Sequence, residues 1–102
     1  MMDVQKSIRM AVDTGEVLLG KNEAQRSLHA GKCKLVVLAQ NLPSDVKLTI
    51  EKKARLAGIP YYVFEGTSSD LGGLCGKPYP ISVMAVVDEG DSDILSLVKK
   101  GE

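Results

Sequence analysis

The sequence contains no tryptophan, one histidine and two cysteines among its 102 residues. Cys33 and Cys75 lie far apart and neither has a second cysteine beside it, which excludes a CxxC redox motif and a cysteine-based zinc site. We expect both to be free, partly buried thiols. His29 has no serine or cysteine nucleophile at a recognisable motif spacing. We therefore predict no catalytic residue and a protein that is not an enzyme.

Long apolar runs are also missing. The longest runs, Leu35 to Ala39 and Val83 to Val87, are far shorter than the roughly 20 residues of a membrane-spanning helix. The first residues lead directly into an amphipathic pattern, without a basic segment followed by an apolar signal core. We therefore expect a cytoplasmic location and no contact with a membrane. The length predicts one domain, residues 1–102.

An excess of either charge is absent as well. Thirteen Lys and Arg residues balance thirteen Asp and Glu residues, whereas proteins that bind nucleic acid usually have a basic balance. The distribution is uneven, however. Residues 20–60 carry eight basic groups against three acidic ones, and residues from 61 onward carry three basic groups against seven acidic ones. One part of the chain can therefore face a polyanion while the other faces water.

Five stretches have the apolar spacing and the end signals of helices. The first three helices are expected from Asp3 to Gly15, from Asn22 to Gly31, and from Pro43-Ser44 to Gly58, with Gln25 as the capping-box partner of Asn22. A short fourth helix follows the capping box Thr67 to Asp70, and the final helix begins at Asp91 or Ser92. The expected inward residues of the last two long helices are Val46, Ile50, Ala54 and Ala57, and then Ile94, Leu95 and Val98.

Four apolar segments between these helices are typical of strands. They are residues 17–19, 35–39, 61–64 and 81–87. Strands that alternate with helices predict crossover connections and a sheet with helices on both faces. The fold class expected from this pattern is α/β, a three-layer α/β/α sandwich.

Motifs that bind phosphates or metals are incomplete. The segment Gly72 to Lys77 has Leu71 where a phosphate-binding loop needs glycine and Pro78 where it needs serine or threonine. The glycine spacing of a dinucleotide-binding fold is also wrong. The acidic turn after Val87 lacks the glycine and the final glutamate of a calcium loop. We therefore expect no cofactor and no metal.

The segment Gly20 to Arg26 is the best candidate for ligand binding. Free N–H groups at a helix start attract anions, and Lys21 and Arg26 strengthen that attraction for RNA phosphate. Glu23 would repel phosphate, so we infer that it accepts hydrogen bonds from a base edge, with Asn22 beside it. An ordinary capped and solvated helix start explains the same residues.

A second candidate is the apolar loop Tyr79-Pro80-Ile81. An exposed aromatic ring in a loop bounded by proline suits stacking on an unpaired base. A buried loop anchor is the competing interpretation.

Over nearly its whole length the chain resembles the superfamily of proteins that bind RNA kink-turns, and within it the L-thirty-e family of archaeal and eukaryotic large ribosomal subunits. The resemblance is strongest in Lys34 to Asn41, in Leu71 to Lys77 and in Asp88 to Leu95. It implies a three-layer sandwich around a four-stranded mixed sheet, in which at least one strand runs antiparallel.

The resemblance also implies an RNA surface that combines two loops. Residues at the start of the second helix match the kink-turn contact segment, and the loop before the fourth strand matches the one that packs against an extruded nucleotide. The RNA-binding residues expected are Gly20, Lys21, Asn22, Glu23, Arg26, Asn41, Lys77, Tyr79, Pro80 and Ile81.

The function implied is that of a structural component of the large ribosomal subunit that binds and stabilises a kink-turn. Its partners would be ribosomal RNA and other ribosomal proteins, with no small-molecule substrate and a monomeric free state. The Asn22-Glu23 pair looks more like the superfamily's stand-alone kink-turn binders, so a subunit of a guide RNA-protein particle is an alternative. A small nucleotide-binding α/β domain is an alternative from another class.

Overall fold

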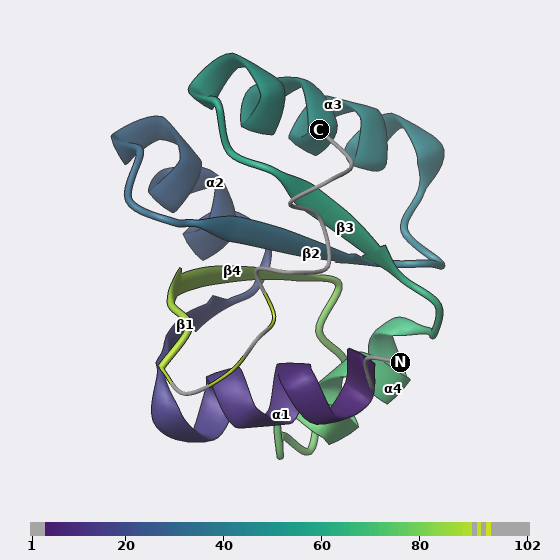
Figure 1. Ribbon diagram of the computed structural model, residues 1–102. Helices are drawn as coiled ribbons and strands as arrows, with labels where there is room; N and C mark the ends of the chain where they lie inside the picture. Colours follow the sequence, from purple (N-terminus) through teal and green to yellow (C-terminus); the bar gives the residue numbers. More distant parts are fainter. Residues whose placement is uncertain (1–3, 91, 93, 95–102) are drawn as a thin grey trace.

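The computed structural model describes residues 4–90, 92 and 94 of the chain. In this part of the chain, four helices and four strands alternate (Figure 1). They are α1 (Val4–Thr14), β1 (Glu16–Leu19), α2 (Lys21–Ala30), β2 (Leu35–Ala39), α3 (Ser44–Ala57), β3 (Tyr61–Phe64), α4 (Ser68–Leu74) and β4 (Val83–Asp88). None of these described helices is long and apolar enough to cross a membrane.

The four strands form one mixed sheet with the order β1-β4-β2-β3. β4 runs antiparallel to both of its neighbours, whereas β2 and β3 are parallel. The segment β2-α3-β3 is therefore a crossover unit of the kind that alternating strands and helices predict. The antiparallel β4 confirms the mixed sheet that the family resemblance implies.

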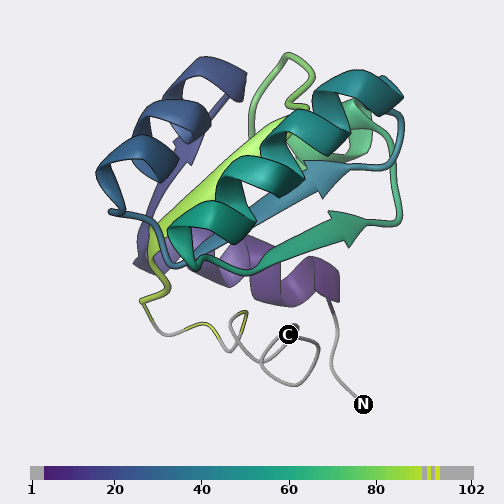
Figure 2. The same cartoon turned by 90° about the horizontal axis from the view of Figure 1, so that it is seen from above.

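Helices cover both faces of the sheet, α2 and α3 on one side and α1 and α4 on the other (Figures 1 and 2). One core, which includes Leu71 and Cys75, lies between the sheet and α1 with α4. The second core, which includes Ile50 and Cys33, lies between the sheet and α2 with α3. This arrangement confirms the three-layer α/β/α sandwich. Both cysteines are free, as predicted, and both are buried where partial burial was expected.

Most helix ends follow the signals in the sequence. Gly31 and Gly58 end α2 and α3 in the left-handed conformation, which glycine adopts at little cost. At the start of α4, the Thr67 hydroxyl accepts a hydrogen bond from the N–H of Asp70, and the Asp70 carboxylate accepts one from the N–H of Thr67. The predicted capping box is thus confirmed.

The prediction for the start of the second helix is wrong. α2 begins at Lys21 with Gly20 as its N-cap, and no side chain caps it. Asn22 is therefore a residue of the first turn and not the cap. The physical reason is the turn at Gly20, which has a φ of 108° and is fixed by the hydrogen bond from its N–H to the carbonyl of the distant Val83, so that the helix cap lies two residues earlier.

One further boundary and one inward residue differ from the predictions. The fourth strand begins at Val83 and not at residue 81, because the N–H of Ile81 donates to the Ser68 carbonyl of α4 at 2.9 Å. Ala57 is exposed at the end of α3, and Ile59, just beyond that helix, is buried in the core instead.

Most of the predicted last helix, including its inner residues Leu95 and Val98, lies outside the described residues, as does the predicted cap Asp3. Ile94 is described, and it is buried in the core next to α1 and α4.

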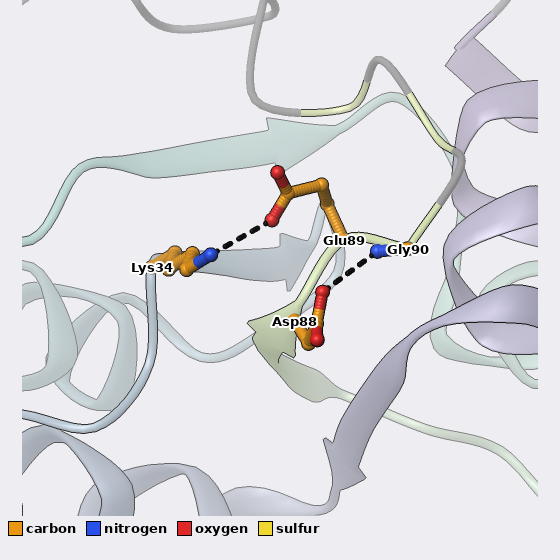
Figure 3. Close-up of polar contacts among 4 residues, drawn as sticks. All are labelled: Lys34, Asp88, Glu89 and Gly90. Carbon is orange, nitrogen blue, oxygen red and sulfur yellow. Dashed lines mark hydrogen bonds and ion pairs between the residues drawn. The ribbon is translucent and has the colours of Figure 1, made fainter.

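The acidic turn after β4 closes one end of the sheet (Figure 3). The Lys34 ammonium group lies 3.1 Å from the Glu89 carboxylate, and the Asp88 carboxylate accepts a hydrogen bond from the N–H of Gly90 at 2.9 Å. These contacts hold the end of β4 against the start of β2. The acidic groups Asp88 and Glu89 therefore lie at the opposite end of the sheet from the loop that follows β1.

Candidate RNA interface

Loops at one end of the sheet surround an open hollow. β1 ends at Leu19 opposite Met84, and Leu38 near the end of β2 pairs with Val83 at the start of β4. The segments after β1 and β2 therefore meet the segment before β4. The hollow between them has a volume of about 340 Å³. Its lining residues are Leu19, Gly20, Lys21, Leu42, Pro43, Val46, Tyr79, Pro80, Ile81 and Ser82.

Gly20 makes the turn from β1 into α2. Its φ of 108° and ψ of 154° belong to a region that only glycine adopts without strain. Its N–H donates to the Val83 carbonyl at 2.8 Å. A β-carbon at this position would meet no atom within 4 Å, so glycine is needed for its conformation and not for space. The turn fixes the start of α2 beside the start of β4.

The first turn of α2 presents polar groups to solvent. No side chain caps the helix, and Ala24 donates the first bond within the helix, to the Gly20 carbonyl at 3.0 Å. The N–H groups of Lys21, Asn22 and Glu23 therefore have no acceptor within the helix. The exposed Asn22 side chain has no hydrogen-bond partner among the described residues. Donors of this kind at a helix start favour an anion, and they lie next to the hollow.

Glu23 and Arg26 form an ion pair on the exposed face of α2. Their charged atoms are 3.5 Å apart, and the Arg26 and Glu23 side chains are 78% and 50% exposed. Exposed pairs of this kind contribute little to stability. Either group can therefore leave this pair for another partner at little cost to the fold.

The Tyr79 loop is held against α4. Tyr79 is 52% exposed and lines the hollow with Pro80. Gly72 makes this packing possible, because a β-carbon there would lie only 2.2 Å from the Tyr79 carbonyl oxygen. An aromatic side chain is thereby presented at the rim of the hollow on a supported loop.

Three of the predicted residues have other surroundings. Ile81 touches the hollow but is only 2% exposed and packs in the core, so it supports the loop from beneath. Asn41 accepts a hydrogen bond from the N–H of Ser68 at 2.9 Å, which ties the end of β2 to α4. Lys77 is exposed but does not line the hollow.

The sequence-based prediction missed one wall of the hollow. Leu42, Pro43 and Val46, from the segment after β2 and the first turn of α3, complete the lining. Their signal was available in part, since apolar residues just after a strand end lie at the same edge as the other loops. The strand pairing that brings this edge beside the Tyr79 loop was not visible in the sequence.

A second hollow of about 560 Å³ lies on the other side of the sheet, and α1, α4 and the end of β3 contribute to it. Two of its lining residues, Glu65 and Asp70, are acidic and none is basic. Burial raises the pKa of the Tyr62 phenol in this hollow, and the charge of Glu65 raises it further. This side is therefore unsuited to a polyanion.

Known proteins match this chain over nearly its whole length. The sequence model of the family described as "Ribosomal protein L7Ae/L30e/S12e/Gadd45 family" matches residues 2–96. A large ribosomal subunit protein eL30 of Methanothermobacter thermautotrophicus is 50% identical over 97 residues, which cover 95% of this chain and 99% of that protein. The eL30 protein of Methanopyrus kandleri is 46% identical over 100 residues, covering 98% and 92% of the two chains.

A solved structure of a protein of unknown function from Bacillus halodurans is similar in shape. Its TM-score is 0.81, and the match covers 96% of this chain and 97% of that one. At 23% sequence identity, this similarity supports the fold alone.

Proposed function

Because the chain belongs to the ribosomal protein L7Ae/L30e/S12e/Gadd45 family, we propose that it is a structural component of the large ribosomal subunit that binds and stabilises a kink-turn in RNA. The names of its relatives support the ribosomal part of this proposal. The hollow in which the start of α2 meets the Tyr79 loop supports the RNA part. Ribosomal RNA and neighbouring ribosomal proteins would be its partners, its place would be the ribosome in the cytoplasm, and no catalysis is needed.

Phosphate binding is assigned to the start of α2. The N–H groups of its first turn and the positive end of the helix dipole favour an anion. Lys21, which lines the hollow, and Arg26, on the exposed face of α2, add positive charge. These contacts orient the RNA backbone and carry no sequence information themselves.

Base recognition is assigned to Asn22 and Glu23. Asn22 can both donate and accept hydrogen bonds, and its side chain has no partner among the described residues. Glu23 accepts hydrogen bonds, and base amino and imino groups donate them. A carboxylate beside a polyanion is favourable only where it meets such donors, which bases in non-Watson–Crick pairs expose.

The hollow itself suits an unpaired nucleotide. Its walls include the apolar residues Leu42, Val46 and Pro80, and Tyr79 lies at its rim. An extruded base is excluded from water by stacking on such an aromatic ring, which contributes roughly 1–3 kcal/mol per base. Kink-turns offer both features, a bulged strand and tandem G·A pairs, within one bent RNA.

Binding to two RNAs tests this proposal. One RNA contains a kink-turn, and in the other the tandem G·A pairs are replaced by Watson–Crick pairs. We expect the second RNA to bind at least about 30-fold more weakly, because two altered base pairs cost roughly 1–3 kcal/mol each. Equal dissociation constants would overturn the proposal.

A second candidate function follows from the Asn22-Glu23 pair in the first turn of α2. This pair resembles the one in stand-alone kink-turn binders, so a guide RNA-protein particle is the alternative host. Sequencing of the RNA that crosslinks to the protein in cell extract separates the two. Ribosomal RNA from the large subunit is the expected result, and guide RNA alone would favour the alternative.

A further inference from the structure

Positive charge is concentrated on the side of the sheet that α2 and α3 cover. Arg26 and Lys34 pair with carboxylates, but within the described residues the other basic groups of residues 20–60 form no ion pair. They are Lys21, Lys32, Lys47, Lys52, Lys53 and Arg55. α2 and α3 together carry six Lys and Arg residues against three acidic ones, whereas α1 and α4 on the other side carry two of each. A polyanion is therefore attracted to the α2–α3 side.

Lys53 is held in a defined position between the two helices. Its ammonium group donates to the Oε1 atom of Gln25 on α2 at 2.6 Å, and α2 and α3 lie side by side (Figure 2). Lys53 is half-buried, so it loses less side-chain freedom on binding a ligand than an exposed lysine does. Gln25 is neutral, so the positive charge is not compensated. An ammonium group has three N–H donors, and two remain for another acceptor.

This bridge between Gln25 and Lys53 lies close to the proposed RNA contacts. On α2, Gln25 follows Asn22 by three residues, about 4.5 Å along the helix axis and on the same side of it. On α3, Lys53 lies on the same stripe as Val46, which lines the hollow, about two turns further along. Helical side chains point back towards the N-terminus, which brings the ammonium group nearer to the hollow.

We propose that Lys53 binds a backbone phosphate of the RNA stem that continues from the kink-turn along α2 and α3, with Gln25 holding the ammonium group in place. This inference rests on the proposed function and adds a third contact to its two loops. We assign a phosphate as its partner, because the ammonium group acts as a point charge that Gln25 does not neutralise. The contact strengthens binding without sequence preference.

The salt dependence of binding tests the proposal. Lys53→Gln is compared with Lys52→Gln and Arg9→Gln, which remove the same charge. Lys52 lies on the outermost stripe of α3 between the exposed Leu48 and Leu56, and Arg9 lies on α1 across the sheet. The dissociation constant for kink-turn RNA is measured at several salt concentrations. Loss of one phosphate contact lowers the slope of log affinity against log salt by about 0.7–0.9.

We expect Lys53→Gln to lower the slope by this full amount and each control variant to lower it by less than half as much. Lys53→Arg should have a slope close to that of the unchanged chain. An unchanged slope for Lys53→Gln would overturn the proposal, as would an equal decrease for Lys52→Gln, which would indicate general attraction. A lower melting temperature with an unchanged slope would show that Lys53 only holds α2 against α3. If the unchanged chain does not prefer kink-turn RNA to its Watson–Crick counterpart, the proposed function fails, whatever the slope.

Discussion

Replacement of Gly72 by alanine tests how the Tyr79 loop is held in place. A β-carbon at Gly72 would lie 2.2 Å from the Tyr79 carbonyl oxygen, whereas ordinary contacts begin at 3.4 Å. The obstacle is backbone, so the loop itself has to move by more than 1 Å. Gly73, the next residue of α4, provides a matched control, because a β-carbon there meets no atom within 4 Å.

The two variants should differ in melting temperature. Alanine in place of glycine in a helix stabilises by roughly 1 kcal/mol, so Gly73→Ala should raise the melting temperature by about 4–8 °C. Gly72→Ala makes the same helical gain, but it overpacks the contact with the loop at a cost of about 1–3 kcal/mol. The net result should be a melting temperature that is unchanged or lower.

RNA affinity provides the second readout. Displacement of Tyr79 forfeits a stacking contact of roughly 1–3 kcal/mol, so Gly72→Ala should weaken kink-turn binding by about tenfold or more. Gly73→Ala should bind like the unchanged chain. Tyr79→Ala, which removes the ring and leaves α4 intact, should reproduce the affinity loss of Gly72→Ala. If Gly72→Ala binds as tightly as Gly73→Ala, the loop does not present Tyr79 to RNA and the reasoning is refuted.

Three further predictions concern single groups. Glu23→Gln should weaken kink-turn binding by about tenfold, because its carboxylate accepts hydrogen bonds from a base edge. Glu51→Gln, which removes the same charge, should leave the affinity equal or slightly higher. A tighter complex for Glu23→Gln would contradict base recognition by Glu23. Burial raises the pKa of the Cys75 thiol, so iodoacetamide should modify Cys75 more slowly in the folded chain than in the unfolded chain; equal rates would contradict the structure. The pKa of the Glu89 carboxyl is lowered by a hydrogen bond from its own backbone N–H and, to a smaller extent, by Lys34. The carboxylate therefore stabilises the fold above the pKa that Glu89 has in the unfolded chain, and this stabilisation is lost as the pH falls through its lower pKa in the folded chain. In an NMR titration, Lys34→Gln should raise the Glu89 pKa, and an unchanged value would show that the ion pair does not form in solution.

The regular elements could be predicted because their signals are local. The boundaries of β2 and β3, and the glycines that end α2 and α3, depend on residues within or next to each element. The start of α2 was predicted wrongly because a contact distant in sequence decides it. Asn22 is a favourable cap by composition, but the bond from Gly20 to Val83 fixes the turn two residues earlier.

The site could be predicted only in part for the same reason. Each loop was recognisable by its residue types, and the family resemblance joined them. The antiparallel β4 brings Leu42 and Val46 beside the Tyr79 loop, and a strand that is apolar on both faces carries no signal of its direction. Likewise, the hydrogen bond from the Ile81 N–H to the Ser68 carbonyl of α4, which keeps Ile81 out of the strand, joins residues too far apart in sequence to be predicted.

Chemical-shift mapping tests the two-loop interface most directly. The ¹⁵N-labelled chain is titrated with kink-turn RNA, and amide shifts are followed along the sequence. The largest changes should fall on residues 20–26 and 79–82, with little change along α1. The RNA that has Watson–Crick pairs in place of the G·A pairs should produce much smaller changes at the same concentration. Largest changes around the second hollow, at Val4, Tyr62 and Leu74, with the start of α2 unaffected, would contradict the proposed interface.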